Sequence, residues 1–138
     1  MEIYKSKFLE IIPHQGKLME FVWSDHSAHL TDEDFRQELL QQVKMVEQHK
    51  PAYLLIDTTH FMFAISPDVQ TWIDNEVYPA WAGAGVVKIA LLMSSEFIAQ
   101  LSVEQAIDEN TQKNLESNFF ESKENALSWF EGQVLKSH

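Results

Sequence analysis

Two short apolar runs open the chain, and a turn sequence separates them. The runs are KFLEII at 7–12 and KLMEFVW at 17–23, and both are rich in Phe, Ile and Val. Between them lies PHQG, in which Pro13 and Gly16 favour turn geometry. This pattern predicts an antiparallel β-hairpin at the start of the fold.

The next apolar positions recur with the period of a helix. Thr31 begins this predicted helix with a variant capping box, in which Asp34 takes the place of the usual Glu. Pro51 closes the helix, because proline cannot continue it. Side chains separated by four, four and three residues form its apolar stripe: Phe35, Leu39, Val43 and Val46.

A second strand and helix follow in the middle of the chain. YLLID at 53–57 is a short apolar run that ends in a carboxylate, which suits a central strand covered on both faces. The next helix begins at Pro67, a favoured first position, and Pro79 should kink it or end it early. Gly83 and Gly85 break the helix. Its apolar side consists of Val69, Trp72, Ile73, Val77 and Trp81.

The C-terminal part repeats the alternation of strand and helix. VVKIALLM at 86–93 predicts a buried strand, and Ser94 or Ser95 caps a third helix. LESNFF at 115–120 predicts the last strand, and Ser122 caps the final helix. The expected inward positions are Phe97, Leu101 and Ile107 in the third helix, and Ala126, Leu127, Phe130 and Val134 in the last.

The predicted order of elements is β-β-α-β-α-β-α-β-α. Strands that alternate with helices imply a largely parallel sheet, because a parallel return needs a crossover. The opening hairpin makes the sheet mixed. We therefore expect an α/β fold with a mixed, mostly parallel five-stranded sheet and four helices, in a single domain over residues 1–138.

The charge of the chain narrows the range of partners. The formal net charge is −11 and the pI is about 4.8, so the protein repels phosphate backbones and anionic membrane surfaces. We expect no nucleic-acid binding. No apolar run approaches the roughly 20 residues of a membrane-spanning helix, and the N-terminus lacks the features of a secretory signal. With no cysteine in the chain, we expect a cytoplasmic protein without thiol chemistry.

The order of elements and two sequence segments resemble a known family. The YLLID strand feeds a helix capped by Ser66, and the chain closes with FFESKENALSWF at 119–130. Together these features resemble the STAS domain, and within it the SpoIIAA-like branch that is similar to anti-anti-sigma factors. The resemblance covers nearly the whole chain. It implies a domain without catalytic machinery that binds other proteins, such as a regulatory kinase or an anti-sigma-type protein.

The resemblance also implies a role for one hydroxyl. In the classical members, a Ser at the start of the second helix is phosphorylated by a kinase partner, and Ser66 matches that acceptor. Asp57 matches the acid at the end of the preceding strand. The match is incomplete, because Ile65 stands in the place of an acidic residue and Pro67-Asp68 in the place of Ser-Gly.

Ser66 has two interpretations from the residues themselves. As an N-cap, its hydroxyl accepts a hydrogen bond from a backbone N–H, and its loss would cost about 1 kcal/mol. As a phosphoacceptor, it would gain about −1.5 to −2 charges. The helix N-terminus favours such a charge, whereas Asp68 and the net charge of −11 oppose it.

Asp57, Thr58 and Thr59 lie where the central strand ends. The carboxyl end of a parallel strand is a common place for the sites of α/β proteins. Alternatively, Asp57 accepts loop N–H groups and fixes the turn. Asp25, His26 and His29 form D-H-x-x-H, which on a helix could bind a metal ion. The stretch is expected to be a loop without further ligands, so no metal or other cofactor is predicted.

The aromatic stretch Phe61-Met62-Phe63 is either a minor core over the sheet edge or an adaptable contact surface. The second helix adds residue types that are enriched at interfaces: Trp72, Tyr78 and Trp81.

Phosphate-loop, dinucleotide, nucleophile-elbow and zinc-protease motifs are missing. The leading prediction is therefore a non-enzymatic protein-binding domain that uses the 58–66 loop and the second helix, with a homodimer as a further possible assembly. The alternative is a carrier of a small, lipid-like apolar ligand, with a pocket between the second helix and the sheet.

Overall fold

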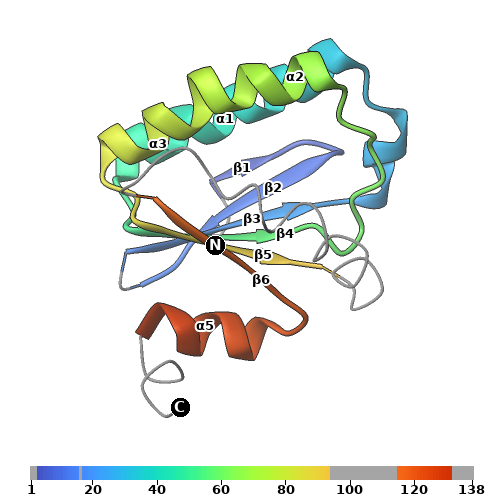
Figure 1. Ribbon diagram of the computed structural model, residues 1–138. Coiled ribbons are helices and arrows are strands. Elements are labelled where there is room, and N and C mark those ends of the chain that lie inside the picture. Colours follow the sequence, from blue (N-terminus) through green and yellow to red (C-terminus); the bar gives the residue numbers. More distant parts are fainter. Residues whose placement is uncertain (1–2, 16, 94–114, 132–138) are drawn as a thin grey trace.

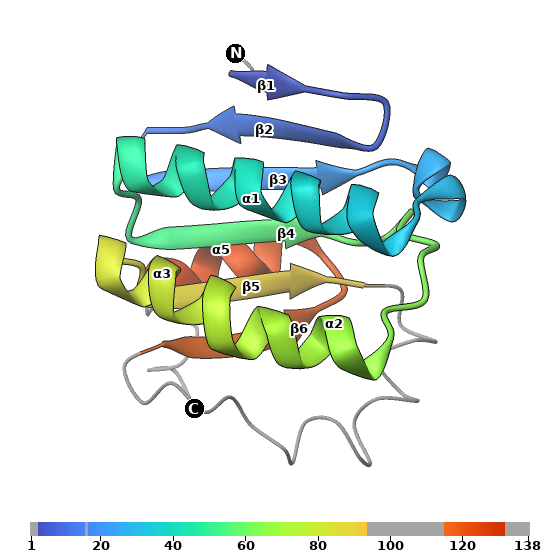
Figure 2. The same cartoon turned by 90° about the horizontal axis from the view of Figure 1, so that it is seen from above.

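The computed structural model describes residues 3–15, 17–93 and 115–131, and within them the fold is an α/β sandwich around one mixed sheet (Figure 1). The sheet has six described strands: Tyr4–Lys5 (β1), Leu9–Pro13 (β2), Leu18–Trp23 (β3), Tyr53–Asp57 (β4), Lys88–Leu92 (β5) and Glu116–Phe120 (β6). Their order in the sheet follows their order in the chain, as Figure 2 shows. The strands from β1 to β3 pair antiparallel, and those from β3 to β6 pair parallel.

Helices cover both faces of the sheet. One face carries Asp32–His49 (α1) and a continuous helical segment made of Pro67–Trp72 (α2), Ile73–Val77 (η2) and Tyr78–Ala84 (α3). Lys123–Glu131 (α5) lies on the opposite face (Figure 1). A short 3-10 helix, Asp25–His29 (η1), joins β3 to α1.

Strand β4 shows why the sheet needs both helical layers. Leu54 and Ile56 are buried in the larger core beneath α1 and α3, whereas Leu55 is buried in the smaller core beneath α5. Side chains alternate across a strand, so an unbroken apolar run must be covered on both sides. The prediction of a central, doubly covered strand at 53–57 is confirmed.

The hairpin and the first helix are also confirmed. Strands β2 and β3 pair antiparallel around the predicted turn. The backbone N–H of Asp34 donates to Thr31 Oγ1 over 3.0 Å, and the N–H of Thr31 donates to Asp34 Oδ2 over 3.3 Å, which completes the capping box. After α1, Lys50 adopts a left-handed backbone with φ of 50° and turns the chain toward Pro51.

Pro79 does not end the second helix, which continues to Ala84. Proline has no N–H to donate, and its ring clashes with the carbonyl of the preceding helical turn. The chain avoids this clash with the π-helical turn η2, in which the N–H of Tyr78 bonds to the carbonyl of Ile73. The helix therefore accommodates Pro79 through a local π-helical widening. Gly85, with φ of 110°, then terminates the helix as expected.

The prediction of five strands is wrong, because β1 adds a sixth within the described residues. Strand β1 has only two residues, too few to show an alternating pattern. The last strand and helix are confirmed, and Ser122 Oγ accepts the N–H of Asn125 over 3.1 Å as a cap. The predicted third helix from Ser94 or Ser95, and the inward position of Val134, lie outside the described residues.

None of the helices in the described ranges combines the length and apolar character needed to cross a membrane.

Candidate functional site

The loop 58–66 connects β4 to α2 at the end of the sheet where both α1 and α2 begin (Figure 2). Strands β3, β4 and β5 are parallel, so their carboxyl ends share this edge. This is the position that α/β sheets commonly use for binding. The loop therefore lies beside two helix N-termini and the η1 turn.

Hydrogen bonds fix the beginning of the loop. Asp57 Oδ1 accepts from the Thr59 N–H over 3.0 Å and from the Thr59 hydroxyl over 2.6 Å. The N–H and the hydroxyl of Thr58 both donate to the carbonyl of Leu92, over 2.9 and 2.7 Å. These contacts match the interpretation in which Asp57 fixes the turn, and they also tie the loop to the end of β5.

The two phenylalanines of the loop pack inward. Together with Trp23 and Phe35 they form an aromatic cluster, in which the ring centroids of Trp23 and Phe61 lie 5.1 Å apart and those of Phe35 and Phe63 lie 4.8 Å apart. Such ring pairs contribute about 0.5–1.5 kcal/mol each beyond their buried area. Phe61 and Phe63 are half-buried, so their main role is to anchor the loop on the core.

Met62 lies between the two phenylalanines in the sequence, and its side chain points to solvent. Its side chain is 63% exposed, while its backbone N–H donates to the buried Ser27 Oγ over 2.8 Å. Ile65, near the end of the same loop, is 38% exposed. The loop is thus held in place while it presents two apolar side chains. Both residues belong to the predicted contact loop 58–66, but only Met62 was singled out there, as part of the stretch Phe61-Met62-Phe63.

Ser66 caps α2, as one of its two interpretations predicts. Its Oγ accepts the N–H of Val69 over 3.3 Å. The same hydroxyl donates to Asp32 Oδ2 over 3.5 Å. Asp32 is the first residue of α1, so the contact joins the starts of the two helices across the surface. A carboxylate next to the hydroxyl is a feature that no sequence pattern indicated.

The three interface-type residues of the second helix have different environments. Trp72 is half-buried, and the Arg36 guanidinium lies 5.9 Å from its ring centroid. Trp81 is buried in the core, 6.1 Å from Phe21 between ring centroids. Tyr78 packs against Trp81, and burial raises the pKa of its phenol above 10.0. Tyr78 and Trp81 belong to α3, at the opposite end of the helical layer from the loop (Figure 2).

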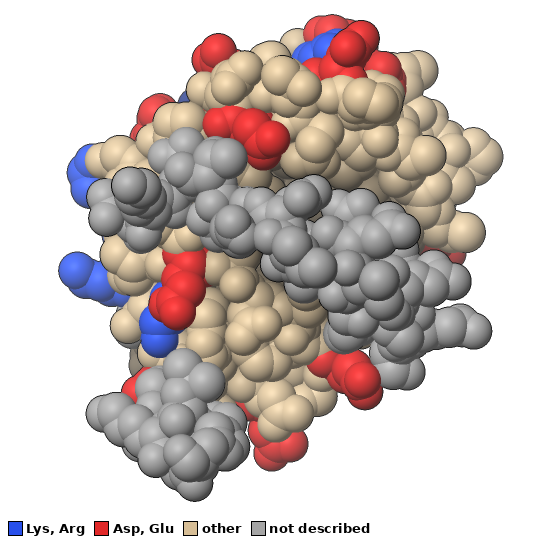
Figure 3. Space-filling model, viewed as in Figure 1, with Lys and Arg blue, Asp and Glu red and all other residues tan. Residues whose placement is uncertain are grey.

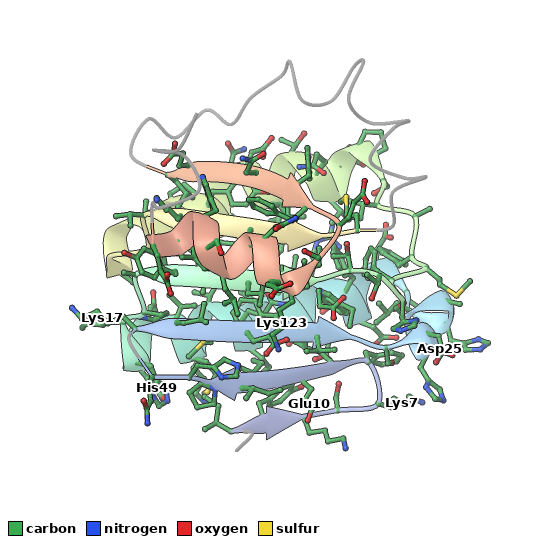
Figure 4. All side chains as sticks on the ribbon, turned by 90° about the horizontal axis from the view of Figure 1, so that it is seen from below. Lys7, Glu10, Lys17, Asp25, His49 and Lys123 are labelled. Atoms are coloured by element: carbon green, nitrogen blue, oxygen red, sulfur yellow. The ribbon has the colours of Figure 1, made fainter. Side chains whose placement is uncertain are left out.

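The D-H-x-x-H stretch folds as the 3-10 helix η1 rather than as the expected irregular loop. Asp25 extends into solvent at the end of the sheet (Figure 4), and its Oδ1 lies 3.6 Å from His26 Nδ1. His29 ends the same helix. Within the described residues, no three or more His, Cys, Asp or Glu side chains are grouped to hold a metal ion.

Comparisons of this chain with protein-family models, with curated proteins and with solved structures find no match. The similarity to STAS domains therefore stays a prediction, and the geometry of the loop 58–66 is the structural observation that bears on function.

Proposed function

We propose that this chain is a non-enzymatic regulatory domain that binds another protein, as its resemblance to SpoIIAA-like STAS domains implies. The contact region, called the docking surface below, consists of Met62, Ile65, Ser66, Asp68 and Trp72. The observation that carries the proposal is the exposure of Met62 (63%) and Ile65 (38%) on a loop whose backbone is fixed.

Fixed exposure of apolar side chains suits binding for a physical reason. Association must offset the entropy lost when loops and side chains become ordered. In the loop 58–66, hydrogen bonds from Thr58 and Met62 and the aromatic cluster have already ordered the backbone. Burying Met62 and Ile65 against a partner would therefore add hydrophobic stabilisation with little further ordering cost.

The test compares two double variants by affinity capture from an extract of the source cells. Met62→Asp with Ile65→Asp places charges in the docking surface and should abolish capture of the partner. Leu40→Asp with Val87→Asp is the matched control, because these side chains are also exposed (44% and 45%) but lie in α1 and before β5. Equal capture by both double variants, with unfolding midpoints unchanged, would remove the docking surface from the proposal.

Ser66 is the proposed covalent switch on this surface. A phosphoryl group would replace the hydroxyl hydrogen that Ser66 donates to Asp32, 3.5 Å away. It would bring about −1.5 to −2 charges to this position. At about 4 Å in water each pair of unit charges repels by about 1 kcal/mol, so the repulsion is about 2 kcal/mol. The dipole at a helix N-terminus stabilises a negative charge by only about 0.3–1 kcal/mol. Phosphorylation would thus separate the start of α2 from α1 and change how the docking surface meets its partner.

Two substitutions separate the charge of Ser66 from its capping role. Asp and Asn are both good N-caps, so Ser66→Asp and Ser66→Asn should both keep the cap of α2. Only Ser66→Asp places a negative charge beside Asp32, so its partner capture should differ from that of Ser66→Asn. Identical capture by the two variants would rule out a charge switch, and an intact-mass measurement of protein from source cells reports whether Ser66 is modified.

The second candidate function, a carrier of a small apolar molecule between the second helix and the sheet, has one supporting observation. Gln42 Nε2 in α1 and Trp81 Nε1 in α3 are buried and have no hydrogen-bond partner among the described residues. A buried donor without an acceptor costs about 1–3 kcal/mol. A ligand with a carbonyl or hydroxyl oxygen would recover part of that cost.

Native mass spectrometry of freshly purified protein distinguishes the two functions. A bound lipid-sized mass that Trp81→Phe removes would support the carrier. An unliganded mass favours the protein-binding domain.

A further inference from the structure

The docking surface has a rim of acidic side chains. The first turn of α1 contains Asp32, Glu33 and Asp34, and the first turn of α2 contains Asp68. All four side chains are exposed. The contact between Ser66 and Asp32 places the two helix starts side by side, and Figure 3 shows acidic side chains gathered at the end of the helical layer where α1 and α2 begin.

Basic side chains near this rim are few among the described residues. Arg36 lies over the ring of Trp72 and is half-buried, and this contact leaves its positive charge in place. Lys7 reaches the same end of the sheet from the β1–β2 turn, as Figure 4 shows beside Asp25. The chain as a whole carries a net charge of −11. The four carboxylates of the rim outnumber these two basic groups, so the docking surface has a net negative charge.

Acidic residues in a first helical turn also have a local role, because they complement the helix dipole. Asp34 has this role in the capping box of α1. That role explains charge at the two helix starts, but it does not explain Met62 and Ile65 exposed next to them. An apolar centre with a polar, solvent-accessible rim is typical of protein-binding surfaces.

We infer that the partner of the docking surface is a basic protein or peptide, with apolar pockets for Met62 and Ile65 and a rim of Lys and Arg. This inference rests on the proposed function. Complementary potentials raise association rates by about 10- to 10³-fold and suppress wrong partners. Nucleic acids and anionic membranes carry the wrong sign. A second copy of this chain is disfavoured as well, because a two-fold interface through this surface would bring the acidic rims of both copies together.

The experiment uses a displayed library of random dodecapeptides selected on the full chain. Enriched peptides should carry net positive charge and large apolar residues. Their affinity should fall at least about tenfold between about 50 and about 500 mM NaCl, because salt screens exposed charges. Enrichment of neutral or acidic peptides would overturn the inference. So would peptide affinity that does not change with salt concentration.

Three double variants separate this inference from the proposed function. Asp32→Asn with Asp68→Asn should lower the association rate about tenfold and remove most of the salt dependence. Glu47→Gln with Glu124→Gln changes the net charge equally, from −11 to −9, on exposed positions elsewhere, and should bind nearly as the unaltered chain does. Equal effects of these two pairs would contradict a specific acidic rim.

The third double variant, Met62→Asp with Ile65→Asp, should abolish peptide binding at every salt concentration. Peptide binding that depends on Met62 but not on the acidic rim would refute the basic partner and leave the proposed function standing. Peptide binding that is independent of Met62 would refute the docking surface itself. Sedimentation of the full chain measures its oligomeric state. A dimer that the Met62 and Ile65 substitutions dissociate would identify a second copy as the partner and overturn the inference.

Discussion

Ser27→Ala is the substitution that most directly tests how the loop 58–66 is held. Ser27 is fully buried in η1, and its Oγ accepts the backbone N–H of Met62, a residue 35 positions further along the chain, over 2.8 Å. The change to Ala removes one oxygen atom and leaves the rest of the η1 backbone intact. The N–H of Met62 then has no acceptor at a partly buried position.

The expected loss follows from that geometry. A buried donor left without an acceptor costs about 1–3 kcal/mol, and because the site is only partly buried we expect the lower part of this range, about 1–2 kcal/mol. For a domain of this size, 1 kcal/mol corresponds to about 4 °C in the unfolding midpoint, so the midpoint should fall by about 4–8 °C. Partner capture should fall too, because the loop loses its pre-ordered backbone.

Two measurements check the expectation. Urea unfolding gives the change in global stability, and hydrogen exchange followed by fragment mass analysis reports the Met62 amide directly. Loss of the acceptor should speed exchange at that amide at least about tenfold. Ser128→Ala, the same chemical change at a half-exposed position of α5, should alter stability by less than about 0.5 kcal/mol. Unchanged protection of the Met62 amide in Ser27→Ala would refute the role of this bond in holding the loop.

Three further predictions concern groups outside the loop. Burial, and secondarily the Asp74 charge, raise the pKa of Tyr78 above 10.0, so folding favours the neutral phenol and stability should fall as the pH rises above 10.0. The urea midpoint of Tyr78→Phe should decline less over the same pH range, because this variant has no phenol to titrate. Buried Glu20 accepts from Lys123 over 3.2 Å, and Glu20→Ala should cost about 1–3 kcal/mol whereas Lys123→Met should cost under about 1 kcal/mol, because the lysine is half-exposed. Trp81→Phe keeps most of the buried area without the unpaired N–H, so thermal unfolding should show a far smaller loss than the about 3–5 kcal/mol expected for Trp81→Ala.

The elements that sequence pattern predicted correctly are those whose signal is local. The apolar stripe of α1 and its capping box require only residues one or two turns apart, and the doubly buried strand β4 is an unbroken apolar run. Strand β1 was missed because pairing with β2 defines it, and two residues carry no period of their own. The π-helical turn before Pro79 likewise follows from how the packed helix avoids a clash, which depends on the tertiary structure.

The candidate site depended more on contacts between distant residues. The bond between Ser66 and Asp32 joins positions 34 apart in the chain, so a local pattern could identify the cap but not its acidic neighbour. Sequence pattern drew attention to the aromatic residues of the loop, but it left open whether they face the core or the surface. Phe61 and Phe63 face inward because Trp23 and Phe35 offer them rings to pack on, and that arrangement leaves Met62 outside.

The agreement between chain order and sheet order has a consequence for synthesis on the ribosome. Each new strand pairs with the strand made just before it, so the sheet can grow at one edge while the chain emerges. The hydrogen bonds and ring contacts that hold the loop 58–66 lie within residues 23–92. A nascent chain can therefore hold the loop 58–66 in its finished form before β6 and α5 have emerged from the ribosome.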